Sequence, residues 1–120
     1  MDKIHNYKDL IVWQKAIELV IEIYKITELY PESEKYGLTS QMRRCAVSIP
    51  SNIAEGRRRG TRKDFRQFLL IAYGSGSELE TQIEITKKLS FSAKINFAFS
   101  DSLLDEVMRM LNKMTSGLRS

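Results

Sequence analysis

Apolar residues recur every three or four positions over most of the chain, which is the pattern of amphipathic helices. Long stretches contain neither glycine nor proline, and the only prolines are Pro31 and Pro50. No segment alternates apolar and polar residues between turn signals, as a half-buried strand would. The pattern predicts an all-α fold, an antiparallel up-down four-helix bundle, with helices at about residues 8–29, 39–55, 62–89 and 101–117.

The first predicted helix, which Pro31 stops, carries more apolar surface than one face of a bundle can bury. Its predicted core seam consists of Leu10, Trp13, Ile17, Val20 and Tyr24. Other apolar side chains lie off this seam, namely Ile11, Val12, Ile21, Ile23 and Ile26. Because no helix is central in a four-helix bundle, the second apolar surface predicts self-association.

The second predicted helix contains Pro50 within its apolar stripe, which consists of Leu38, Met42, Cys45, Ile49 and Ile53. Proline removes a backbone donor and crowds the carbonyl one turn earlier, so we expect a kink here. The kink is either a functional bend or a packing adjustment. We expect Gly56 to end this helix and residues 57–63 (RRRGTRK) to form a short basic turn.

The third predicted helix begins with a capping pattern, because Asp64 follows Thr61 by three residues. Residues 74–77 (GSGS) are unusual within a helix, and we interpret them as a place where another helix packs closely. The predicted seam of this helix is Phe65, Phe68, Leu69, Ala72, Gly76, Leu79 and Ile83. The fourth helix has a heptad-like stripe of Leu104, Val107, Leu111, Met114 and Leu118.

Positive charge is concentrated in one short stretch. Between residues 43 and 66 there are eight basic residues and two acids, a net +6 in a chain whose total is +4. Such a run is either a solvated helix end or a surface for an anion, with phosphate as the leading candidate, because the arginine fork pairs with phosphate through two hydrogen bonds. The candidate nucleic-acid-binding residues are Arg43, Arg44, Arg57, Arg58, Arg59, Arg62, Lys63 and Arg66.

Composition narrows the function classes. The chain is long enough for one domain (residues 1–120), and it has neither a secretory signal nor an apolar run long enough to span a membrane. Cys45 is the only cysteine, which rules out an internal disulfide, fits a reducing cytoplasm and suggests a small buried hydrophobe. His5 is the only histidine and lies in the leader. We therefore predict no catalytic residue, no metal site, no cofactor and no small-molecule substrate.

Three stretches carry a family resemblance: YKDLIVWQKA, then YGLTSQMRRCAVSIPSNIAEG, then FRQFLLIAYGSGSELETQ. They resemble the four-helix-bundle family of 23S rRNA intervening-sequence proteins, also called S23 ribosomal proteins, over about residues 7 to 89. The resemblance implies a ring-shaped homopentamer and a bacterial source. It also implies similarity to the accessory variability determinant proteins of diversity-generating retroelements, which bind nucleic acid. It supplies no catalytic residues.

Together these observations predict a non-enzymatic, oligomeric protein that binds nucleic acid, RNA rather than DNA, through its arginine-rich patch. No aromatic residue is interleaved with the arginines, so we expect recognition by charge and shape. The alternative hypothesis is an adaptor whose basic patch docks an acidic protein.

Overall fold

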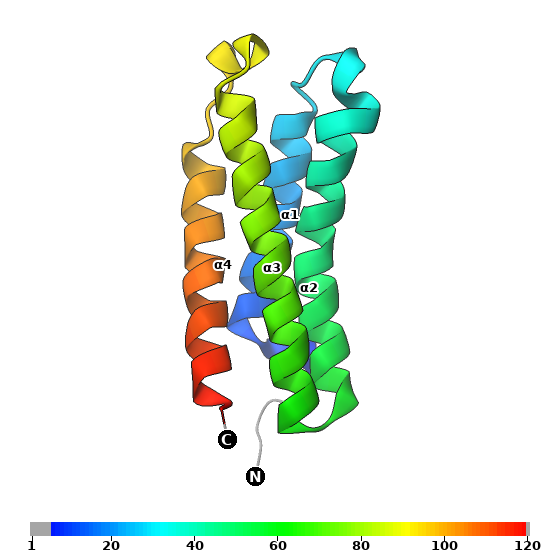
Figure 1. The fold of residues 1–120 in the computed structure, drawn as a ribbon, viewed down its shortest axis with the longest axis vertical. Coiled ribbons are helices and arrows are strands. Elements are labelled where there is room, and N and C mark those ends of the chain that lie inside the picture. Colours follow the sequence, from blue (N-terminus) through cyan, green and yellow to red (C-terminus); the bar gives the residue numbers. More distant parts are fainter. Residues whose placement is uncertain (1–5, 120) are drawn as a thin grey trace.

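The computed structural model describes residues 6–119, and over this range the chain is helical, with no strand. The four long helices are α1 (Ile11–Thr27), α2 (Ser40–Arg59), α3 (Arg62–Lys87) and α4 (Ala98–Gly117). They pack side by side into a rod of 51 × 24 × 22 Å, and the chain reverses direction at each connection (Figure 1). The predicted all-α fold of four packed helices is confirmed.

The order of the helices around the bundle places α1 and α3 on opposite sides. Helix α1 packs against α2 and α4, and α3 also packs against α2 and α4. In Figure 1, α3 accordingly lies in front and α1 behind. The outward faces of α1 and α3 therefore point in opposite directions.

The prediction that Gly56 ends the second helix is wrong. Helix α2 continues to Arg59, and Gly60 ends it with a φ of +86°, a left-handed conformation that glycine adopts without strain. Gly56 has a different role, because a β-carbon at this position would lie 2.6 Å from Cβ of Phe68 on α3. Its missing side chain lets α2 and α3 approach closely.

Residues 57–63 therefore do not form the predicted basic turn. Arg57, Arg58 and Arg59 make the last turn of α2, and Arg62 is already the first residue of α3. The predicted cap is confirmed, since the Thr61 hydroxyl accepts a hydrogen bond from the Asp64 amide at 3.1 Å. This tight connection fixes the basic side chains on two helix ends.

The predicted core seam of α1 is also largely wrong, although Leu10, the residue before the helix, is buried as predicted. The side chains that point into the bundle are Val12, Ala16, Leu19, Ile23 and Ile26. Trp13, Ile17 and Val20 are only half-buried, and Tyr24 is 42% exposed. Both stripes have helical spacing, so packing against α2 and α4 decides which one is buried. Helix α1 does retain apolar surface outside the core, with Ile11 and Ile21 more than half exposed.

The core predicted for the other helices is largely confirmed. Met42, Ile49 and Ile53 of α2 are fully buried, as are Leu69 and Leu79 of α3. In α4 the fully buried stripe includes Val107 and Leu111. Pro50 is buried inside α2, which continues on both sides of it, and the kink stays a prediction.

The GSGS run serves close packing, as expected. The Ser75 hydroxyl lies 2.8 Å from that of Ser48 on α2. A β-carbon on Gly76 would collide with Sδ of Met108 on α4. Both small residues therefore bring α3 close to its neighbours.

Candidate functional site

Six of the eight predicted binding residues lie at one end of the bundle, where α2 ends and α3 begins (Figure 1). The structure adds Arg119, which follows α4 and lines a hollow together with Arg62, Lys63 and Arg66. Sequence reasoning missed Arg119, because it lies more than 50 positions away from the others in the chain. We call these seven side chains the basic end: Arg57, Arg58, Arg59, Arg62, Lys63, Arg66 and Arg119.

Two residues of the basic end also hold the fold together. Arg62 donates a hydrogen bond to the Gly117 carbonyl at 3.3 Å, and Arg66 donates to the Thr115 carbonyl at 3.1 Å. The last carbonyls of a helix lack partners within it and carry partial negative charge, so cations stabilise this end of α4. Arg62 and Arg66 therefore have a structural role at a helix end. Each guanidinium still has further N–H groups that can bind a ligand.

Three further cations of the basic end, Arg58, Arg59 and Lys63, are exposed. Arg59 pairs with Glu55 at 3.0 Å, and its guanidinium also lies 5.0 Å from the centre of the Phe68 ring. Arg58 lies over the ring of Tyr7, with 5.4 Å between its guanidinium carbon and the ring centre. Lys63 is exposed on the neighbouring helix. These three cations are accessible to an anionic partner.

Arg43 and Arg44 lie elsewhere. Arg43 is fourteen residues before Arg57 on α2, about 20 Å along the helix. Its guanidinium donates to the Thr27 hydroxyl at 2.8 Å, lies 3.6 Å from a Glu28 carboxylate oxygen and stacks on the Tyr24 ring. The structure gives Arg43 a role in joining α1 to α2 and does not bring it to the basic end.

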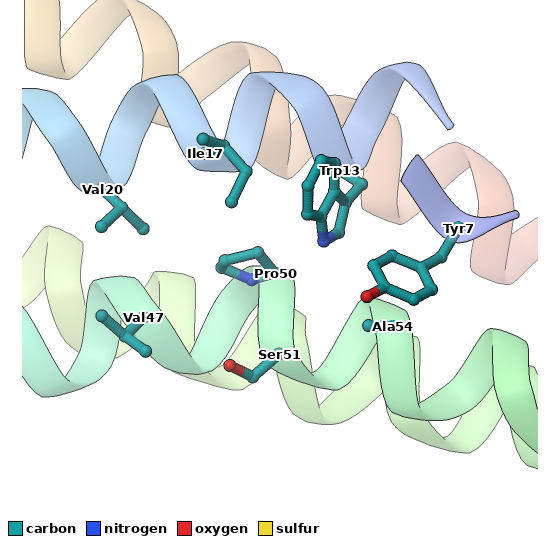
Figure 2. Close-up of a pocket in the computed structure, with 8 residues that line it drawn as sticks. All are labelled: Tyr7, Trp13, Ile17, Val20, Val47, Pro50, Ser51 and Ala54. Carbon is teal, nitrogen blue, oxygen red and sulfur yellow. The ribbon is translucent and has the colours of Figure 1, made fainter. Parts of the chain in front are cut away.

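An apolar groove between α1 and α2 leads to the basic end. Figure 2 shows side chains of both helices converging on it, with Tyr7 at one end beside Trp13 and Ala54. The groove has a volume of about 280 Å³ and is lined by Tyr7, Trp13, Ile17, Val20, Val47, Pro50, Ser51 and Ala54. Tyr7 also lines a second, more polar hollow together with Asn6, Arg57 and Arg58.

The described residues include no group of three metal-ligating side chains and no helix long and apolar enough to cross a membrane. Burial raises the pKa of the Cys45 thiol, and a hydrogen bond from Gln82 only partly offsets this. A raised pKa keeps the thiol protonated, which is the opposite of what a nucleophile needs. His5 lies outside the described residues.

The fold and site together define a four-helix bundle with an arginine-rich end. The family model of the 23S rRNA-intervening sequence protein matches residues 8–113, and the chain belongs to this family. A crystal structure from Bacteroides thetaiotaomicron, of a protein of unknown function from the S23 ribosomal protein family, is similar in fold, with a TM-score of 0.78. The two chains are 22% identical over 88% of this chain and 96% of the other. No curated protein matches this sequence.

Proposed function

We propose that this protein is a non-enzymatic, oligomeric bundle that binds nucleic acid through the basic end. The observation that carries the proposal is the convergence of seven cations from three separate segments on one end of the rod. Between residues 55 and 66, which contain six of these cations, the only acidic residues are Glu55 and Asp64. We propose RNA rather than DNA because the name of the matching family refers to 23S rRNA.

The composition of the basic end favours phosphate as the bound group. Six of its seven cations are arginines, and a guanidinium group can donate two parallel hydrogen bonds to one phosphate. Arg62 and Arg66 are held in place by carbonyls of α4, so little side-chain freedom is lost when they bind an anion. Contacts of this kind position a nucleic-acid backbone.

The exposed apolar surface supports the oligomeric part of the proposal. On α1, Ile21 and Tyr24 are 52% and 42% exposed, and we call these two residues with Ile17 the α1 strip. On α3, four large apolar side chains are exposed, and we call them the α3 strip: Leu70, Ile71, Tyr73 and Ile85. Because α1 and α3 lie on opposite sides of the bundle, the two strips can join copies head to tail. A head-to-tail contact forms a ring where the rotation between neighbouring copies closes, and we propose a closed ring of five copies.

The head-to-tail contact is tested by breaking each strip separately. Ile21→Lys and Ile71→Lys both change exposed side chains, so we expect each variant to stay folded and to become monomeric. In an equimolar mixture of the two variants, the intact α3 strip of the Ile21→Lys variant can still bind the intact α1 strip of the Ile71→Lys variant. Light scattering of this mixture should therefore detect dimers and nothing larger. A native chain that is monomeric, at 13.9 kDa, contradicts the oligomer.

Nucleic-acid binding is tested by reversing charge at two places. The first variant carries Arg58→Glu, Arg59→Glu and Lys63→Glu at the basic end. The matched control carries Lys35→Glu, Lys88→Glu and Lys94→Glu, exposed residues outside the basic end. Each triple change lowers the net charge from +4 to −2, so the two variants have the same net charge and differ in where the charge is reversed.

We expect the basic-end variant to lose binding to structured RNA at low salt and the control to retain most of it. Equal losses would mean that overall charge, rather than the basic end, drives binding. If the native chain binds neither RNA nor duplex DNA, the proposal is wrong, and an acidic protein becomes the partner to seek. Circular dichroism of each variant verifies that the fold persists.

A further inference from the structure

We propose that the basic end takes up an unpaired nucleotide, whose base stacks on Tyr7 in the hollow lined by Asn6, Tyr7, Arg57 and Arg58. The inference rests on the proposed function and specifies the ligand as single-stranded nucleic acid. Sequence reasoning expected no stacking, because no aromatic residue is interleaved with the arginines. The structure brings Tyr7 to them from about 50 positions earlier in the sequence.

Tyr7 is held in a defined position. It begins η1, the short 3-10 turn Tyr7–Asp9 that precedes α1, and its ring is half-buried. The Trp13 ring meets it edge to face, with 5.4 Å between centroids and 65° between the planes. This contact fixes the tyrosine ring at the boundary between the apolar groove and the polar hollow.

The hollow combines an aromatic ring, positively charged side chains and a side-chain amide, three kinds of group that recognise a nucleotide. The Arg58 guanidinium lies over the Tyr7 ring, 5.4 Å from its centre, so a base that stacks on Tyr7 takes the place of Arg58, whose guanidinium then turns toward the attached phosphate. Arg57 and Arg58 bring positive charge for the attached phosphate. The volume of about 350 Å³ is within the range of small-ligand sites, about 300–1,000 Å³.

Asn6 supplies a means of reading the edge of the base. Its side-chain oxygen accepts a hydrogen bond from the Lys8 amide at 2.9 Å, which fixes the orientation of the amide group. The nitrogen of the same amide is a double donor, suited to the acceptors on a base edge. A base within a duplex has both faces covered by its neighbours, so a base that stacks on Tyr7 must be unpaired.

The test compares two ligands on the native protein at one salt concentration. One is a short single-stranded RNA without secondary structure, and the other is a strand of equal length in which abasic sites replace the bases. Both carry the same phosphates, so a difference in affinity reports contacts with bases. We expect the base-bearing strand to bind about fivefold more tightly or better, as one stacked base would produce.

Variants then locate the stacking contact. Tyr7→Leu should abolish the preference for the base-bearing strand, whereas Tyr7→Phe keeps a ring and should retain it. Tyr36→Leu is the matched control, because Tyr36 is 88% exposed and lies between α1 and α2, away from the basic end. It should leave the preference unchanged. Thermal unfolding shows whether each variant is folded.

Two results would overturn the inference while leaving the proposed function intact. The first is equal affinity of the native protein for both strands, with a steep dependence on salt. The second is a Tyr7→Leu variant that keeps the native preference. If neither strand binds at low salt, the proposed function fails, and the inference fails with it.

Discussion

Gly56 provides a sharp test of how α2 and α3 pack. In the Gly56→Ala variant the new β-carbon would lie 2.6 Å from Cβ of Phe68 and 3.3 Å from the Phe65 carbonyl oxygen. Neither a β-carbon nor a backbone oxygen can rotate away, so the two helices must separate. Overpacking of this kind costs about 1–3 kcal/mol. Alanine has a better helix propensity than glycine, and this raises the free energy of unfolding by about 0.5–1 kcal/mol, which offsets part of the cost.

We therefore expect Gly56→Ala to lower the free energy of unfolding by about 1 kcal/mol. With a urea m-value of about 2 kcal/mol/M, the midpoint should fall by about 0.5 M. Urea unfolding followed by circular dichroism measures this, at one fixed protein concentration because self-association is coupled to stability.

Gly117→Ala is the control, since a β-carbon there meets no atom within 4 Å. It should change the free energy of unfolding by less than about 0.5 kcal/mol. A Gly56→Ala variant as stable as the native chain would refute the account of Gly56 as a packing residue.

Three further predictions concern single residues. Arg43→Ala should lower the free energy of unfolding by about 1–3 kcal/mol, because it removes charge-assisted hydrogen bonds between α1 and α2. Arg44→Ala, at an exposed site, is the control and should change the free energy of unfolding by less than about 0.5 kcal/mol in the same urea assay. Thr61→Ala should cost about 1 kcal/mol through loss of the α3 cap, and Thr61→Ser should not, by thermal unfolding. Because burial raises its pKa, Cys45 should react with iodoacetamide only at more alkaline pH than a free cysteine, and a native rate profile matching that of the unfolded chain would contradict this.

Local signals in the sequence predicted the parts of the fold that depend on local interactions. The cap at Thr61 is a contact over three residues, and the stripes predicted for α2, α3 and α4 contain most of the apolar side chains that these helices bury. Helix α1 has two apolar stripes, so spacing alone did not identify the buried one. Gly56 and Gly60 pose the same kind of problem, because only the packing of Phe68 shows which of them lies within the helix.

The candidate site was predicted in part for the same reason. The cations at the α2–α3 connection are consecutive or nearly so, and a charge count finds them. Arg119 and Tyr7 reach the basic end through tertiary structure, which a count along the chain does not register. Arg43 belongs to the charge run in the sequence, but its contacts with Thr27 and Glu28 make it a structural residue.

The most direct test of the central claim is the salt dependence of RNA binding by the native chain and the basic-end variant. For single strands, the logarithm of the binding constant falls with the logarithm of salt concentration by about 0.7 for each phosphate contacted. If Arg58, Arg59 and Lys63 each contact one phosphate, the native slope should be about −2 or steeper, and the variant slope should be shallower by about 2. A native affinity that does not change with salt, or an equal slope in both proteins, would contradict the account of the basic end as a phosphate-binding surface.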